Sequence, residues 1–307
     1  SGQDLARATS GAAATLLGKI YLRNHDYANA KTYIDMVLNS GQYELESDFK
    51  YVWSENNKYG KEMIFALLHE TGNNAAEIAC HFGPSDHPEV PGRWQYYGVS
   101  LPFWRSYDKE DPRREFFYYD YTGDAKRDDQ SDYGFHYMVP EEGVTVVPND
   151  TTKYMQNVAT MKYTYDMISD AYYDGRTICI FRLSDVILCK AEIENNLNGP
   201  AAALPYLNQI RARAGAPEYG KHNRFPAPST KEAMNDAILK ERGYELVFEF
   251  QRRADLIRFG KYEEVVNAHL KKLGIAQPTN VTSSLRYFPY PLNDAQLNPN
   301  LAAENPS

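Results

Sequence analysis

Cysteine is scarce in this chain, and long hydrophobic runs are missing from it. The 307 residues include 3 cysteines, at Cys80, Cys179 and Cys189, with no C-x-x-C pair. This number and spacing indicate neither a disulfide framework nor a zinc site, so we expect the thiols to pack in the interior. No run approaches the roughly 20 apolar residues that cross a bilayer, and the N-terminus lacks the regions of a signal peptide. The chain as given is expected to be soluble.

Positively charged side chains are also in deficit. Lysine and arginine total 33 against 41 acidic residues, which gives a net charge of −8 and a pI near 5.5. Proteins that bind nucleic acid concentrate Lys and Arg on one face, so nucleic acid is not an expected partner. The hydrophobic content of 43% allows a substantial core, in one large domain or two closely joined ones.

Signatures of catalysis and of metal binding are missing too. There is no G-x-S-x-G elbow, phosphate-binding glycine loop or dinucleotide fingerprint, and the 7 histidines show no metal-ligand spacing. Five aspartates crowd one stretch without the spacing of an EF-hand loop. They are Asp120, Asp124, Asp128, Asp129 and Asp132. We predict a solvated acidic loop there, no metal site and no cofactor, with calcium as the alternative.

The most informative pattern runs from Ile238 to Lys261, where charged side chains interrupt an otherwise apolar helix. At about 100° per residue, Glu241, Glu245 and Glu249 share one face of that helix. Carboxylates four residues apart repel unless cations lie between them. We therefore predict a helix over 235–259 that carries a structural ion-pair network. Its members would be Glu241, Arg242, Glu245, Glu249, Arg252, Arg253, Asp255 and Arg258.

A second interpretation makes two of these glutamates the acid and the base of a glycoside hydrolase. Neighbouring arginines lower the pKa of a carboxylate, whereas a general acid needs a raised pKa. The ion-pair scaffold is therefore favoured, and the hydrolase is kept as an alternative.

The same segment is similar to the signature helix of the SusD/RagB family, the surface glycan-binding lipoproteins of Bacteroidetes. Further segments agree with that family in the expected order. They are Lys162-Tyr163, the runs 181–188 and 208–215, Pro289-Tyr290-Pro291, and the runs 298–301 and 304–306. Phe250 departs from the family, which usually has glycine after the third glutamate. Because the resemblance begins partway into the family pattern, we expect an upstream portion with a signal and a lipidated cysteine.

Two helix pairs are predicted from apolar periodicity. The first 40 residues repeat the i, i+3, i+4 spacing twice, with Asp26 as a cap and Gly41 at the end. A second pair is expected around the Asn198-Gly199-Pro200 turn. Small residues such as Gly18 let two helices approach, as in a tetratricopeptide repeat. We predict a mainly α-helical, SusD-like fold of tetratricopeptide-like helix pairs with long loop insertions and minor β structure.

The predicted domain organisation is a single SusD-like domain over 1–307. Its parts would be a first helix pair with the segment after it (1–66), a loop-rich insertion (70–176), a helical scaffold (177–262) and a C-terminal loop segment (263–307). The insertion lacks periodicity and is rich in turn residues. Long irregular stretches within a compact domain are usually functional.

Aromatic rings concentrate beside hydrogen-bonding side chains in that insertion. A sugar presents C–H groups on its face and hydroxyls at its edge, which a flat ring and flanking polar groups can match. We therefore predict a ligand-binding site there. Its residues would be Arg93, Trp94, Gln95, Tyr96 and Tyr97, together with Tyr133 and Tyr137. The alternative is that Trp94 fills the domain core.

The resemblance implies a function without catalysis. It implies capture of an oligosaccharide at the outer membrane by a surface-exposed lipoprotein, whose lipid anchor would lie upstream, and delivery to a SusC-type TonB-dependent porin. Two other classes stay open: the glycoside hydrolase, and a tetratricopeptide-type scaffold that binds peptides.

Overall fold

A computed structural model describes residues 7–70, 77–84, 87–90, 94–123, 135–144, 152–166, 175–272, 281–286, 288, 290–298 and 300. The chain divides into two compact units, residues 1–245 and 246–307. The domain boundaries predicted from the sequence stay predictions. Among the residues described, no helix combines the length and the apolar character needed to cross a membrane.

The first helix pair consists of α1 (Ser10–Arg23) and α2 (Tyr27–Leu38). The Thr9 side chain accepts a hydrogen bond from the Ala12 amide, and Asp26 accepts one from Asn29, so each helix begins at a side-chain cap. The two helices approach closely at Gly18, where an added Cβ would lie 2.8 Å from the Ile34 side chain. This glycine therefore sets the spacing of the pair.

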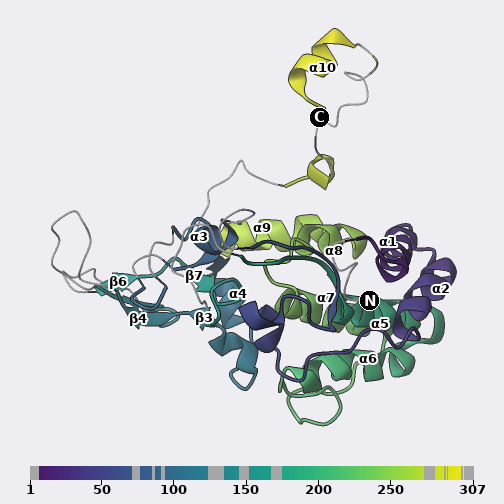
Figure 1. The fold of residues 1–307 in the computed structure, drawn as a ribbon, viewed down its shortest axis with the longest axis horizontal. Helices are drawn as coiled ribbons and strands as arrows, with labels where there is room; N and C mark the ends of the chain where they lie inside the picture. The colour runs from purple at the N-terminus through teal and green to yellow at the C-terminus, as the bar shows by residue number, and fades with distance from the viewer. Residues whose placement is uncertain are drawn as a thin grey trace. The chain divides into compact units, whose positions relative to one another are not determined.

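The second pair consists of α5 (Leu183–Asn198) and α6 (Pro200–Arg213), joined by Gly199 with a φ of 90°. Helix α5 packs against α2, α6 and α7 (Lys231–Glu245), and every residue from Leu183 to Asn195 is buried (Figure 1). A helix that is enclosed on all sides belongs to the interior of its unit. The core of the first unit therefore forms around α5.

The helix predicted over 235–259 is wrong as a continuous element. Helix α7 ends at Glu245, whose carbonyl oxygen accepts hydrogen bonds from Lys162 and Arg182 at 2.8 and 2.9 Å. Phe248 and Phe250 then adopt φ values of 62° and 60°, a left-handed conformation in which a right-handed helix does not continue. Helix α8 (Arg252–Arg258) begins after this break.

The strands of the first unit form small sheets. Strands β1 (Met63–Leu67) and β8 (Ile178–Arg182) pair antiparallel, and β8 leads directly into α5. The insertion holds helices α3 (Ile78–Phe82) and α4 (Leu101–Arg105) and two three-stranded sheets. One sheet has the order β2 (Val99–Ser100), β7 (Asn157–Thr160), β3 (Phe117–Tyr118); the other has β4 (Asp120–Thr122), β5 (His136–Met138), β6 (Thr152–Tyr154).

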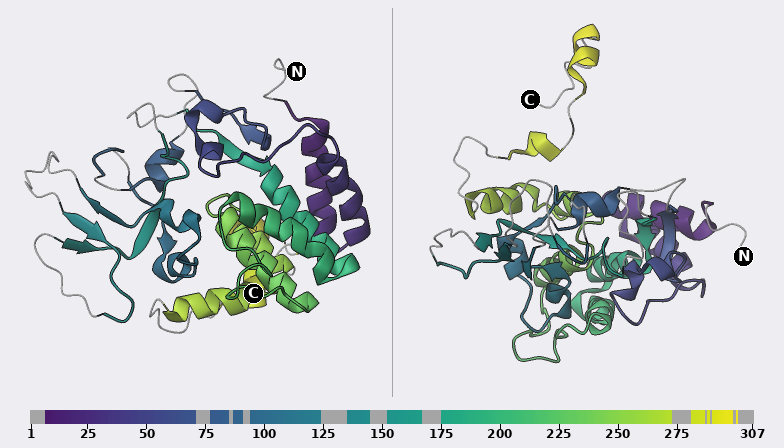
Figure 2. Two further views of the ribbon diagram at one scale, coloured as in Figure 1. Left: turned by 90° about the horizontal axis from the view of Figure 1, so that it is seen from below. Right: turned by 60° about the vertical axis from the view of Figure 1, so that its left-hand side comes forward.

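The strand-rich insertion and the first helix pair lie at opposite ends of the first unit. Strands β4 and β6 are far from α1 and α2 in Figure 1, and the views in Figure 2 agree. Helices dominate the described residues and the strands are short. The predicted fold class, mainly α with tetratricopeptide-like pairs and minor β structure, is confirmed.

The second unit contains α8, α9 (Tyr262–Lys272), a 3-10 turn (Ser283–Arg286) and α10 (Leu292–Leu297). The Asn267 side chain both donates to and accepts from the backbone of Val281, at 2.9 and 2.7 Å. Arg286 forms two hydrogen bonds with Glu263 of α9. These contacts hold the segment that begins at Val281 against α9.

Candidate functional site

The predicted aromatic segment lies at the surface of the first unit. Trp94 is 37% exposed, Tyr96 65% and Tyr97 56%. Trp94 is therefore not a core residue, and the alternative that it fills the core is wrong. Arg93, which was predicted to belong to the same site, lies outside the described residues.

Backbone hydrogen bonds fix this segment to the last turn of α3. The amide of Trp94 donates to the Cys80 carbonyl oxygen at 2.8 Å, and the amide of Tyr97 donates to that of His81 at 3.1 Å. Carbonyls in the last turn of a helix have no partner within the helix, so α3 offers acceptors where the aromatic segment passes. These two hydrogen bonds therefore hold the aromatic segment against α3.

Gln95 makes the turn that brings the rings together. Its φ of 49° is unusual for a residue other than glycine, and its side-chain amide donates to Asn157 Oδ1 of β7 at 3.2 Å. A Cβ added at Gly98 would lie 2.2 Å from the same oxygen, so the absence of a side chain at Gly98 leaves room for Asn157. Gln95 thus serves as an anchor, and its amide is engaged with the protein.

One residue that the sequence did not single out lies at the centre of the rings. The His81 ring centroid is 5.2 Å from that of Trp94, 5.4 Å from Tyr96 and 6.2 Å from Tyr97. The Trp94 and Tyr96 rings are also in contact, with centroids 5.4 Å apart. We call His81, Trp94, Tyr96 and Tyr97 the aromatic cluster. His81 and Trp94 are 13 positions apart, and the sequence between them has no periodic signal that could have linked them.

Tyr137 lies in a different group of side chains. Its ring stacks on that of Tyr121 with centroids 4.9 Å apart, and its hydroxyl accepts a hydrogen bond from Lys153 at 3.4 Å. These residues come from the central parts of β4, β5 and β6. Tyr133 lies outside the described residues. The contacts of the described residues therefore do not join Tyr137 to the aromatic cluster.

Glu241 and Glu245 of α7 lie in a buried network of ion pairs. Arg113 Nη1 is 2.6 Å from Glu241 and 3.0 Å from Glu245, and Arg182 Nη1 is 2.7 Å from Glu245. Arg211 pairs with Glu241 at 2.7 Å, and Arg213 pairs closely with Glu245. Arg113 and Arg182 come from segments far from α7 in the sequence, and Arg211 and Arg213 come from α6, the preceding helix. The cations that separate the two carboxylates are therefore supplied by tertiary structure.

The network extends to two further carboxylates. Asp111 accepts two hydrogen bonds from the Arg113 guanidinium, at 3.0 and 2.8 Å. Glu62, which precedes β1, pairs with Arg182 at 2.6 Å and with Arg213 at 2.7 Å. We call the four carboxylates and their partners the buried network. Its members are Glu62, Asp111, Arg113, Lys162, Arg182, Arg211, Arg213, Glu241 and Glu245.

The electrostatics of this network oppose general acid catalysis. Burial by itself would raise the pKa of Glu245, but the guanidinium groups of Arg213, Arg182 and Arg113 hold that pKa well below its ordinary value. The Glu241 and Glu245 side chains are also buried, so a glycan in solvent does not reach them. A proton donor needs a raised pKa and access to its substrate. Glu245 meets neither condition, and Glu241 is closed off from substrate by its burial.

Of the other predicted network residues, Arg242, Asp255 and Arg258 form ion pairs separate from the buried network. Arg242 pairs with Asp185 of α5 at 2.7 Å, and Lys19 contacts the same carboxylate. In the second unit, Asp255 pairs with Arg258 at 2.9 Å, and Arg253 donates to the carbonyl oxygens of Leu285 and Arg286. Glu249 is buried in the turn after α7, and Arg252 begins α8.

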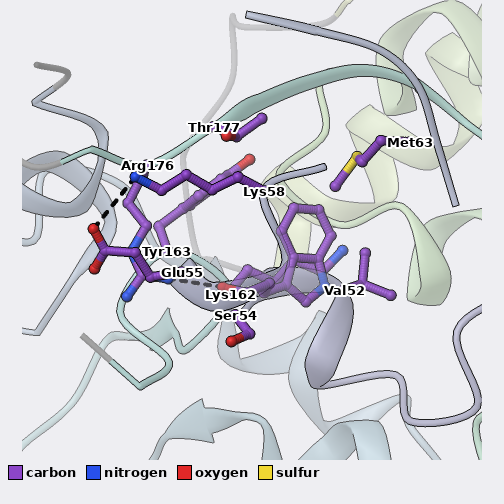
Figure 3. Close-up of a pocket in the computed structure, with 10 residues that line it drawn as sticks. Val52, Ser54, Glu55, Lys58, Met63, Lys162, Tyr163, Arg176 and Thr177 are labelled. Atoms are coloured by element: carbon purple, nitrogen blue, oxygen red, sulfur yellow. Dashed lines mark hydrogen bonds and ion pairs between the residues drawn. The ribbon is translucent and has the colours of Figure 1, made fainter. Parts of the chain in front are cut away.

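A cavity elsewhere in the first unit is too small for a sugar. Its lining includes Glu55, Lys58 and Arg176, which are labelled in Figure 3. Trp53 also lines it, and the Trp53 carbonyl oxygen accepts a hydrogen bond from Arg176 at 2.7 Å. Its volume of about 20 Å³ is enough for one water molecule. A saccharide therefore does not fit in this cavity.

Metal ligands and reactive thiols are not assembled in the part of the chain that the structure describes. Within it, no three His, Cys, Asp or Glu side chains are placed to hold a metal ion. Cys80, Cys179 and Cys189 are buried. Of the aspartates considered for calcium, Asp120 pairs with His136 at 2.6 Å, and the other four lie outside the described residues.

The protein thus has a scaffold of helix pairs with a buried ion-pair network, and a long insertion that carries exposed aromatic rings. These features define a helical scaffold protein with irregular loops at its surface. The chain belongs to the SusD family, whose model matches residues 61–307. The family membership predicted from the sequence is therefore confirmed.

Sequence relatives match either nearly the whole chain or a part of it. SusD-like protein P25 from Formosa agariphila is 26% identical, over 97% of this chain and 58% of its own length. The starch-binding protein SusD from Bacteroides thetaiotaomicron is 28% identical over 44% of this chain and 22% of its own length. This chain thus spans about three fifths of the length of P25.

Solved structures show the same fold. A SusD superfamily protein from Parabacteroides distasonis has a TM-score of 0.70 at 20% identity, over 97% of this chain and 63% of that one. Surface glycan-binding protein A from Bacteroides thetaiotaomicron, in complex with laminarihexaose, has a TM-score of 0.69 at 22% identity, over 95% and 62% of the two chains.

Proposed function

We propose that this protein binds an oligosaccharide without cleaving it, through the exposed rings of Trp94, Tyr96 and Tyr97. The observation that carries this proposal is the exposure of three neighbouring rings on an anchored segment. Monomeric proteins rarely leave such apolar groups together at the surface unless they bind something. Sugar C–H groups can pack on the ring faces, and the tyrosine hydroxyls can meet sugar hydroxyls.

The nature of the relatives supports a carbohydrate as the ligand. One structural relative is in complex with laminarihexaose, and one sequence relative is named a starch-binding protein. Binding without catalysis is supported by the burial of Glu241 and Glu245 and by the depressed pKa of Glu245.

The cellular role that we propose follows the family. The protein would act as a lipoprotein exposed on the outer membrane, held by a lipid anchor upstream of this chain, and would deliver its ligand to a SusC-type TonB-dependent porin. Binding without cleavage fits this role, because the ligand must be retained over the pore and then released unchanged. Arg93, Tyr133 and Tyr137 stay predictions for the ligand site. The absence of a cofactor also stays a prediction, with calcium as its alternative.

Sugar affinity of a double variant tests the proposal. Trp94→Ala, Tyr97→Ala removes two exposed rings, and we expect at least a tenfold loss of affinity for a glycan bound by the wild type, because each stacking ring contributes about 1 kcal/mol or more. Isothermal titration with laminarihexaose and soluble starch, followed by a glycan array, would measure this.

A matched control is available in the same unit. Tyr51 and Tyr59 are 44% and 53% exposed outside the aromatic cluster, so Tyr51→Ala, Tyr59→Ala should bind as the wild type does. Equal glycan binding by the wild type and the Trp94→Ala, Tyr97→Ala protein would exclude the aromatic cluster as the site.

A further inference from the structure

We infer that His81 is a positioning residue for sugar binding: its ring is the support that fixes the relative orientation of Trp94, Tyr96 and Tyr97. This inference rests on the proposed function, but its geometric part can be measured without a ligand. His81 itself need not contact the sugar.

The first observation is the shared ring contact. The three rings point to one imidazole, with ring centroids 5.2–6.2 Å away, and the contacts are edge-on to Trp94 and tilted to the two tyrosines. An edge-to-face geometry is favourable for aromatic pairs, and all three distances lie within the contact range of such pairs. Trp94 and Tyr96 therefore gain a preferred orientation from contact with His81, and Tyr97 gains its own from His81 together with Phe82, whose ring centroid is 5.2 Å away.

The second observation is that His81 also supplies a backbone contact. Its carbonyl oxygen accepts the hydrogen bond from the Tyr97 amide, while the neighbouring Cys80 carbonyl accepts that from Trp94. The backbone of the segment and its side chains are thus located by the same turn of α3. A ring on a mobile loop loses conformational freedom on binding, and fixing it beforehand reduces that cost.

The third observation concerns what holds the imidazole. Its Nδ1 atom is buried and has no hydrogen-bond partner among the residues that the structure describes. Glu77 Oε2 lies 3.8 Å from Nε2, which is longer than a hydrogen bond. Ring packing rather than polar bonding therefore sets the orientation of His81. A phenyl ring should do the same, because it presents similar faces and leaves no buried nitrogen without a partner.

Tryptophan fluorescence can report this geometry directly. Trp53 and Trp104 are each 5% exposed, so acrylamide should quench mainly Trp94. His81→Ala should increase quenching, because Trp94 loses the ring against its edge. Acrylamide should quench the fluorescence of His81→Phe to the same extent as that of the wild type. His222→Ala is the control, since His222 packs on Phe225 outside the cluster.

Sugar affinity completes the experiment, with laminarihexaose and soluble starch as probes and thermal unfolding of each variant recorded. We expect His81→Ala to bind about tenfold more weakly, as follows from losing an aromatic contact to each ring, and His81→Phe to restore affinity. Should His81→Ala unfold early, His81→Leu keeps most of the volume without a ring, and we expect it to show the same loss.

The outcomes separate the two proposals. If the Trp94→Ala, Tyr97→Ala protein loses binding while His81→Ala and His81→Leu bind as the wild type does, the positioning role is refuted and the proposed function stands. The positioning role is also refuted if His81→Phe does not return sugar affinity and acrylamide quenching to their wild-type levels. If the double variant binds normally, the proposed function fails, whereas the quenching result still decides whether His81 orients the rings.

Discussion

Replacing Glu245 with glutamine should destabilise the protein strongly, because three arginines depend on this one carboxylate. Glu245 is 0% exposed and pairs with Arg113, Arg182 and Arg213. Glutamine keeps the size of the side chain but removes its charge. The buried network then holds five cations against three carboxylates, where the wild type has four.

The expected cost follows from the burial of these charges. Removing one partner of a buried ion pair costs about 3–5 kcal/mol, since the remaining charge stays desolvated without compensation. For a unit of this size, that corresponds to a fall in melting temperature on the order of 10 °C. Urea unfolding followed by circular dichroism measures the free energy of unfolding, provided that the slope with urea does not change.

An exposed ion pair in the same unit supplies the control. Glu44 pairs with Lys61 at 3.0 Å, and both side chains are exposed to solvent. Glu44→Gln should change the free energy of unfolding by no more than about 0.5 kcal/mol, because exposed pairs contribute little. Equal stability of the Glu245→Gln and Glu44→Gln proteins would refute the reasoning that the buried network supports the fold.

Three further predictions concern pH, backbone conformation and the anchor of the aromatic segment. The pKa values of Asp185 and Glu245 lie below their ordinary values of 3.8 and 4.5, so their contribution to stability is complete above these values and is lost as pH falls below about 4; urea unfolding from pH 7 to pH 3 should show this decline, with a flatter profile for Glu245→Gln. Phe250 is 69% exposed at a φ of 60°, so Phe250→Gly should be about 1 kcal/mol more stable than Phe250→Ala, which keeps the strained backbone; equal unfolding free energies would contradict this. Gly98→Ala should displace the Asn157 side chain, break its hydrogen bond to Gln95 and weaken sugar binding while costing about 1 kcal/mol of stability; unchanged affinity by titration would show that the anchor is not needed.

The break after α7 shows how a local rule can fail. Periodicity placed Glu241, Glu245 and Glu249 on one helical face, and the first two do share α7. The rule could not foresee that Lys162 and Arg182 would cap the Glu245 carbonyl from outside the helix. The unusual Phe250, noticed as a departure from the family glycine, lies at one of the two left-handed residues of the break.

The candidate site was also predicted only in part from the sequence. The run from Trp94 to Tyr97 was visible as a concentration of rings, and the turn residues around it indicated a loop. His81 and Asn157 could not be assigned to the site from the sequence. They lie 13 and 63 positions from Trp94, and no periodic pattern connects them to it. Their roles arise from hydrogen bonds to α3 and β7.

The sequence by itself determined the helix pairs, their caps and the family, because these depend on side-chain periodicity and on residues a few positions apart. Only the tertiary structure decided which arginines neutralise Glu241 and Glu245, and which residues hold the exposed rings. Both depend on segments brought together from distant parts of the chain. The physical reason is that charge compensation and ring packing act through space over a few ångströms, whatever the separation along the sequence.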